Sequence, residues 1–252
     1  MASDVITLPD GRRLRWHEFG DPDGSPVIYT AGTPVSGLGG ASYDQTARAA
    51  GLRWISPDKP GYGGSDYQRK RSLTSWGDDL AALAGHLGLD RFALAGESGG
   101  GPYTLAAALR LGGRVRVAAL IATGGPMDPA ERAGQQARIR FYGWLAGNAP
   151  EARHAGLRIG FEAVADALRP GTRGTVQELA LIERPWPFPL SEVKTPVHLW
   201  HGALDTNAPI AIARRLAREL PDATLHVSDS SDHDIGHDRS DEITSVIASC
   251  VK

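Results

Sequence analysis

Apolar and polar residues follow two different periods along this chain, and the change of period marks its expected elements. Short apolar runs typical of buried strands occur at 26–30, 52–56, 91–96, 114–123, 197–202 and 223–230. In 72–87 and 100–111, leucines and alanines recur every three or four residues, which predicts amphipathic helices. Runs at 5–8 and 13–20 flank the turn Pro9-Asp10-Gly11 and predict a hairpin. Strands that alternate with helices predict an α/β fold, with a mostly parallel, doubly wound sheet covered on both faces.

The alternation stops between residues 127 and 190. Helical patterns at 130–149 and 151–169 follow one another without a strand between them, and "ERPWPFPL" closes the segment. The strand and helix alternation then resumes, and a last helix begins near Asp241. We interpret 127–190 as a helical cap inserted in a core made of 1–126 and 191–252.

Composition narrows the classes of protein. Of the 252 residues, 41% are hydrophobic, which is enough for a substantial core. The net charge of −2 and the lack of a cationic run argue against a nucleic-acid partner or an anionic membrane surface. No apolar run approaches the roughly 18 residues of a membrane span, and the N-terminus lacks a signal-peptide pattern. Cys250 is the single cysteine, so no intrachain disulfide can form. We expect a soluble, cytoplasmic protein.

The stretch "LAGESGGGPY" places Ser98 among glycines where a strand ends and a helix begins. Pro102 falls in the first turn of that helix, where its missing N–H costs nothing. In a nucleophile elbow, a serine occupies a strained strand-to-helix turn and needs small neighbours. A strand before the motif and a helix after it favour this interpretation over a tight turn with an incidental serine.

A serine hydroxyl becomes a nucleophile only with a base, and the base needs an orienting acid. Asp205 follows the expected strand 197–202, and His233 lies in the loop after 223–230. The order Ser98, Asp205, His233 is that of the α/β-hydrolases. His237 is an open alternative for the base, whereas His201, at a strand end, is expected to be structural.

The segments "AGTPVSG", "PDKPGYGGSD", "GESGGGPY", "LWHGALDTNAP" and "SSDH" together span residues 31–233. With them the chain resembles the α/β-hydrolase fold superfamily, in its esterase and proline-iminopeptidase-like branch with a short helical cap. The resemblance implies Ser98 as nucleophile, His233 as general base and acid, and Asp205 as the acid that orients His233. It also implies an oxyanion hole made by the backbone N–H groups of Thr33 and Gly99.

The chain departs from the family at the loop that follows its third strand. That loop usually begins His-Gly, and the histidine supports the oxyanion loop, whereas this chain has Ala31-Gly32. We therefore expect slow hydrolysis of generic esters, and we expect Ala31→His either to raise the turnover of small activated esters or to block a bulky natural substrate. Lys59 replaces the usual arginine of the "DRPGYG" loop, and Asp58 and Lys59 are expected to hold that loop without taking part in chemistry.

The sequence thus predicts a serine hydrolase that cleaves a carboxylic ester, thioester, lactone or amide of a small-molecule acyl substrate. No cofactor is expected, and no His, Cys and carboxylate cluster has zinc spacing. The residues expected to line a substrate pocket are Pro34, Tyr103, Trp144 and Trp186. A non-hydrolytic enzyme on the same scaffold, such as an acyltransferase, lyase or epimerase, is the alternative, because this fold supports many chemistries.

Overall fold

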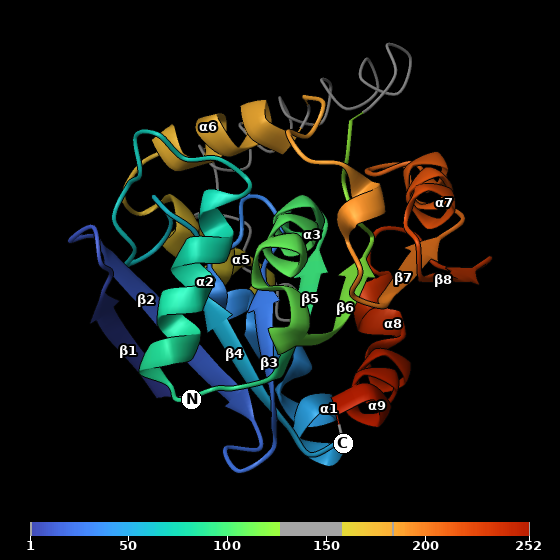
Figure 1. The fold of residues 1–252 in the computed structure, drawn as a ribbon, viewed down its shortest axis with the longest axis horizontal. Helices are drawn as coiled ribbons and strands as arrows, with labels where there is room; N and C mark the ends of the chain where they lie inside the picture. Colours follow the sequence, from blue (N-terminus) through green and yellow to red (C-terminus); the bar gives the residue numbers. More distant parts are fainter. Residues whose placement is uncertain (1, 127–157, 183, 252) are drawn as a thin grey trace.

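The protein's computed structural model describes residues 2–126, 158–182 and 184–251 (Figure 1). Within these ranges, eight strands form one sheet. They are β1 (Ala2–Thr7), β2 (Arg13–Gly20), β3 (Ser25–Thr30), β4 (Leu52–Pro57), β5 (Phe92–Glu97), β6 (Val115–Ile121), β7 (Val197–Gly202) and β8 (Ala223–Ser228).

The sheet has the order β1-β2-β4-β3-β5-β6-β7-β8. The strand β2 is antiparallel to β1 and β4, and the remaining pairs are parallel. This confirms the mostly parallel sheet predicted from the alternation. Because β3 and β5 are parallel neighbours, with Thr30 opposite Gly96, the loop after β3 and the turn after β5 leave the same edge of the sheet side by side.

Helices cover both faces of the sheet (Figure 1). On one face, α2 (Ser75–His86), α3 (Gly100–Leu111) and α7 (Ile210–Glu219) bury Leu80, Tyr103 and Leu216 in one apolar cluster. On the other face, α1 (Asp44–Ala49) and α9 (Ser240–Val251) bury Ala47 and Ile247 in a second cluster. The shorter elements are η1 (Gly37–Tyr43), η2 (Gly112–Arg114), η3 (Leu190–Glu192) and α8 (Ile235–Asp238).

Two more helices, α5 (Arg158–Leu168) and α6 (Arg173–Ile182), follow β6 and precede β7 in the chain. Figure 1 shows α6 at the top of the view, at the opposite end of the molecule from α1 and α9. The expected helix 130–149 lies outside the described residues, and the expected helix 151–169 is described from Arg158 as α5. The division into core and cap at 127 and 190 stays a prediction.

The sequence analysis missed α1, α6 and α8. Each is short, at six, ten and four residues. In α6 a glycine and a threonine follow directly on the first residue, and these residue types weaken a helical pattern. No helix in the described ranges is long and apolar enough to cross a membrane.

Candidate active site

Ser98 lies between the end of β5 and the start of α3, in a backbone conformation that is rare for a residue with a side chain. Its φ is +51°, in the left-handed region that disfavours L-residues. Its N–H donates to the carbonyl of Ile121 (2.8 Å), and its own carbonyl accepts from the N–H groups of Gly101 (3.1 Å) and Gly124 (2.8 Å). These three bonds fix the strained turn on both sides.

Two of the surrounding glycines are explained by close approach. A Cβ at Gly96 would lie 2.1 Å from Oγ1 of Thr104 in α3. A Cβ at Gly101 would lie 1.9 Å from Oγ1 of Thr123, just beyond β6. Both distances are shorter than real Cβ contacts, so only glycine lets α3 start this close to the sheet.

His233 and Asp205 complete a hydrogen-bonded chain that begins at Ser98. Nε2 of His233 lies 3.0 Å from Oγ of Ser98, and its Nδ1 lies 2.7 Å from Oδ2 of Asp205. Oδ1 of Asp205 accepts from the N–H groups of Asn207 (2.7 Å) and Ala208 (2.9 Å), which orients the carboxylate. The structure therefore brings together all three side chains selected from the sequence.

The charges of Asp205 and His233 stabilise each other. Burial raises the pKa of Asp205, but the hydrogen bond and charge of His233 offset this and leave that pKa below its usual value. Burial lowers the pKa of His233, but Asp205, with smaller contributions from Glu97 and Asp234, leaves it above the usual 6.5. The pair thus favours a protonated imidazole next to a carboxylate, the state that forms when His233 takes a proton.

The other nearby histidines lie in different positions. His237 is exposed on α8. His201 is fully buried, with Nε2 2.7 Å from the carbonyl of Ala208 and 3.4 Å from Oδ2 of Asp205. Of the two alternatives for the base, the structure brings His233, and not His237, to Ser98.

The two predicted oxyanion donors are adjacent. Thr33 lies in the loop after β3, and Gly99 directly precedes α3. A Cβ at Gly99 would lie 2.2 Å from Oγ1 of Thr33, so the glycine lets the two backbones approach. In the part of the chain that the structure describes, neither the Thr33 N–H nor the Gly99 N–H has a hydrogen-bond acceptor.

The predicted pocket residues have mixed surroundings. Pro34 is buried, and Tyr103 is fully buried on α3 against the edge of Trp76, with ring centroids 6.5 Å apart. Trp186 is half-buried and stacks on Phe188 at 5.8 Å. Trp144 lies outside the described residues. Their role in binding substrate stays a prediction.

The loop after β4 behaves as expected for Asp58 but not for Lys59. Asp58 accepts from Nε of Arg15 (2.5 Å) and from the N–H groups of Gly37 (2.7 Å) and Gly64 (2.9 Å), and so holds the loop. Nζ of Lys59 lies 4.9 Å from the ring centroid of Tyr62 in its own loop, but its hydrogen bonds go elsewhere: it donates to the carbonyls of Ala31 and Gly32 in the loop after β3, and to a carboxylate on α6.

That carboxylate belongs to Glu178, which the sequence analysis did not select. Glu178 also accepts from Nη2 of Arg71 (3.0 Å) and from the hydroxyl of Thr33. A charged residue in a polar helix normally faces solvent, so the sequence carried no signal of this buried contact.

His17, Asp58 and Asp166 lie close enough together to be considered as metal ligands. However, the guanidinium of Arg15 donates to the carboxylates of both Asp58 and Asp166. Its positive charge takes the place that a cation would fill, so these residues fit an ion-paired link from β2 to α5 better than a metal site.

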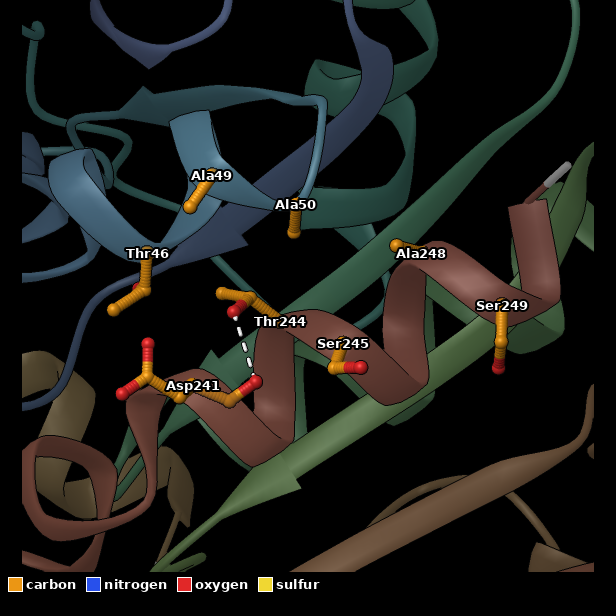
Figure 2. Close-up of a pocket in the computed structure, with 8 residues that line it drawn as sticks. All are labelled: Thr46, Ala49, Ala50, Asp241, Thr244, Ser245, Ala248 and Ser249. Carbon is orange, nitrogen blue, oxygen red and sulfur yellow. Dashed lines mark hydrogen bonds between the residues drawn. The ribbon is translucent and has the colours of Figure 1, made fainter.

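A separate hollow of about 400 Å³ lies between α1 and α9 (Figure 2). Small side chains line it, and Asp241 is its single charged group. The hydroxyl of Thr244 donates to the Asp241 carbonyl within α9 (3.2 Å). Figure 1 shows α1 and α9 at the end of the molecule opposite α6, so the hollow is not part of the Ser98 site.

Comparison with known proteins identifies the family to which this fold belongs. Residues 27–246 match the model of the alpha/beta hydrolase family. The chain therefore belongs to the α/β hydrolase family, as its resemblance implied.

Individual relatives match only parts of the chain. The chain is 36% identical over 120 residues to the dihydrolipoyllysine-residue acetyltransferase component of the acetoin cleaving system of Pseudomonas putida, covering 46% of this chain and 31% of that protein. It is 43% identical over 65 residues to a pimeloyl-[acyl-carrier protein] methyl ester esterase of Aromatoleum aromaticum, covering 26% of each. The chain thus spans about a third or less of these curated relatives. Among solved structures, an esterase from Exiguobacterium antarcticum superposes with a TM-score of 0.79 at 20% identity, covering 98% of both chains, which shows the shared fold.

Proposed function

We propose that this protein is a serine hydrolase that cleaves a carboxylic ester, thioester, lactone or amide through an acyl-enzyme. The observation that carries the proposal is the hydrogen-bonded chain from Ser98 through His233 to Asp205. Ser98 lies on a strained turn beside the backbone N–H groups of Thr33 and Gly99, which have no acceptor among the described residues. This combination of nucleophile, base and orienting acid is the one that acyl transfer requires.

In the proposed acylation step, Oγ of Ser98 attacks the substrate carbonyl while Nε2 of His233 takes the hydroxyl proton. The carboxylate of Asp205 stabilises the imidazolium that forms. The N–H groups of Gly99 and Thr33 donate hydrogen bonds to the carbonyl oxygen and stabilise the negative charge that develops on it. His233 then gives its proton to the leaving group, and the acyl group stays on Ser98.

Deacylation uses the same residues in reverse roles. Water approaches the acyl-enzyme, His233 takes a proton from it, and the hydroxide attacks the carbonyl carbon. The collapse of this second tetrahedral intermediate releases the acid and returns the proton to Ser98. The side chains named here supply every proton transfer in the sequence.

Esters are the substrate class to test first. The Aromatoleum relative is named as an esterase, and so is the Exiguobacterium protein that shares the fold. Esters also have a better leaving group than amides, so a weak hydrolase is easiest to detect with them.

The test is a panel of p-nitrophenyl esters of increasing acyl length, with matched thioesters, lactones and anilides. Covalent labelling by a fluorophosphonate, followed by mass spectrometry of the labelled peptide, locates the nucleophile. We expect label on Ser98 and hydrolysis of at least one ester, both lost in Ser98→Ala. An unlabelled wild-type protein with no turnover on the panel would contradict the proposal.

Acyl transfer to an acceptor other than water is the second candidate, because the Pseudomonas relative is named as an acetyltransferase component. The two functions share the acyl-enzyme and differ in what removes the acyl group. Product analysis in the presence of added alcohols and thiols separates them. Free acid as the dominant product supports hydrolysis, whereas a transferred acyl group that dominates at low acceptor concentration supports transfer.

A further inference from the structure

Three charged side chains meet in the interior beside the Ser98 site. Nζ of Lys59 lies 2.5 Å from Oε1 of Glu178, and Nη2 of Arg71 lies 3.0 Å from Oε2 of the same carboxylate. The side chains are 1%, 0% and 1% exposed for Lys59, Glu178 and Arg71. Burial of charged side chains costs desolvation free energy, so a cluster of three of them needs a structural or functional explanation.

The remaining hydrogen bonds of this cluster converge on one loop. An ammonium group has three donors, and Lys59 uses one on Glu178, one on the Ala31 carbonyl (2.8 Å) and one on the Gly32 carbonyl (3.0 Å). Oε1 of Glu178 also accepts the hydroxyl of Thr33. The cluster therefore bonds to three consecutive residues of the loop after β3.

Two bonds to the Gly32 carbonyl, from Nζ of Lys59 (3.0 Å) and from the backbone N–H of Val35 (2.9 Å), set the direction of the Thr33 N–H. The Gly32 carbonyl and the Thr33 N–H belong to the same peptide unit, which is trans and planar, so the two groups point to opposite sides. With the carbonyl held towards Lys59, the N–H points away from the cluster. Rotation of this peptide would break both bonds and remove the donor.

The cluster is also suited to remain charged near neutral pH. Burial lowers the pKa of Lys59 to about 8, although the carboxylate of Glu178 opposes the shift. Burial raises the pKa of Glu178, but Lys59 and Arg71 together leave it below its usual value. Three donors on Lys59 and a full negative charge on Glu178 are thus available at pH 7.

Position 31, where related loops carry a supporting histidine, is Ala31 in this chain. We infer that Lys59 and Glu178 are positioning residues that fix the Thr33 N–H as the second oxyanion donor, in place of that histidine. Glu178 is part of α6, so the donor depends on a helix inserted between β6 and β7. The inference rests on the proposed function, because it concerns the oxyanion hole of that reaction.

A double-mutant cycle between Glu178→Ala and Thr33→Val tests the inference. Thr33→Val keeps the backbone N–H and removes only the hydroxyl. Loss of a whole oxyanion donor lowers kcat by about 10²–10³-fold, and a loosened donor should cost less, so we expect a fall in kcat of about 10- to 100-fold for Glu178→Ala. KM should change little. The double variant should be no slower than Glu178→Ala, because both changes break the same contact.

The matched control is Asp79→Asn. Asp79 is buried on α2 and pairs with Arg12 at 2.5 and 3.0 Å. Among the described residues it makes no hydrogen bond to the loop after β3. Its link to the cluster is electrostatic: burial raises the pKa of the Asp79 carboxyl, and the charges of Arg12 and Arg71 oppose the increase. This variant should lose thermal stability, as Glu178→Ala should, and keep wild-type kcat. A readout specific to the oxyanion hole is the affinity for phenylboronic acid, whose tetrahedral Ser98 adduct should weaken in step with kcat.

Failure of the inference and failure of the proposed function give different results. If the wild-type protein neither hydrolyses esters nor labels at Ser98, the proposed function fails. If the wild-type protein is active and folded Glu178→Ala keeps kcat and boronate affinity within about threefold, the inference is overturned. Should Glu178→Ala not fold, Lys59→Met decides, since it removes the bond to the Gly32 carbonyl and leaves Glu178 paired with Arg71: an unchanged kcat and boronate affinity in that variant overturn the inference.

Discussion

The hydroxyl oxygen of Ser98 lies 3.0 Å from Nε2 of His233, although 135 residues separate them in the chain. The contact exists because Ser98 projects from a turn at φ +51° after β5, and His233 lies in the loop after β8, at the same carboxyl edge of the parallel strands. Each side is held independently: Ser98 by backbone bonds to Ile121 and Gly124, and His233 by Asp205. The distance is therefore set by the fold.

Ser98→Ala should abolish hydrolysis and labelling while leaving the fold intact. Loss of a nucleophile in a serine enzyme lowers kcat by roughly 10⁶-fold. Alanine occupies the same backbone conformation and removes one partly exposed hydroxyl, so the free energy of unfolding should change by less than about 1.5 kcal/mol. Ester turnover and thermal unfolding followed by circular dichroism check both parts. Full activity in this variant would contradict the nucleophile assignment.

His233→Ala and His237→Ala form a matched pair. The first removes the imidazole in contact with Ser98 and Asp205, so kcat should fall by several orders of magnitude. The second removes an exposed side chain on α8, so kcat should stay near that of the wild type. Steady-state kinetics on one ester suffices. The opposite outcome would mean that the loop after β8 has a different arrangement during catalysis.

The pH dependence of kcat/KM should report the raised pKa of His233. Acylation needs the neutral imidazole, so activity falls as the pH drops through that pKa, above 6.5. Asp205→Asn removes the main group that raises it, and the acid limb should move to lower pH as the plateau falls. A limb that stays in place would show that another group sets it.

The pKa shifts of His233 and Asp205 both stabilise the fold, but their contributions depend on pH in opposite directions. The raised pKa of His233 stabilises the fold at pH below its unfolded value, and this contribution is lost as pH rises through the folded value. The lowered pKa of Asp205 stabilises the fold above the unfolded value of 3.8, and that is lost as pH falls through the folded value. Urea unfolding of wild type and Asp205→Asn across pH measures the difference.

Ala31→His should now lower stability without speeding hydrolysis, contrary to the expectation from sequence. Ala31 is 1% exposed and packs in the same apolar cluster as Tyr29 and Trp54, and its carbonyl already accepts from Lys59. An imidazole there overpacks the core, which typically costs about 1–3 kcal/mol. Thermal unfolding and p-nitrophenyl acetate turnover test this. A stable variant with faster turnover would restore the original expectation.

The sheet and the Ser98 turn could be predicted because their signals are local. Strands buried on both faces give continuous apolar runs, and a strained turn beside a closely packed helix requires glycine at positions such as Gly96 and Gly101. Asp205 lies in the loop after β7 and His233 in the loop after β8, so both lie in loops that follow strands. The candidate site residues could thus be selected from chain order and from the positions of strand ends.

The contacts of Lys59 and Glu178 could not be predicted in the same way. Which charge a lysine meets depends on how a distant helix lies on the sheet, and α6 itself was not recognised in the sequence. The sequence assigned Lys59 to its own loop, whereas the nearest carboxylate comes from residue 178. Pairings between distant polar segments leave no periodic trace.

The hydrogen bond between Thr33 and Glu178 joins positions that are 145 residues apart. Thr33 follows the central strand β3, whereas Glu178 belongs to the short helix α6. Short helices at the edge of a fold open at lower free energy than the central strands of a sheet. If the working conformation of Thr33 depends on α6, heating should inactivate the enzyme in two stages. Ester turnover would disappear first, at a temperature where β3 and β5 are still paired and the circular dichroism of the sheet is unchanged. Cooling from that stage would restore turnover, because the core would not have unfolded.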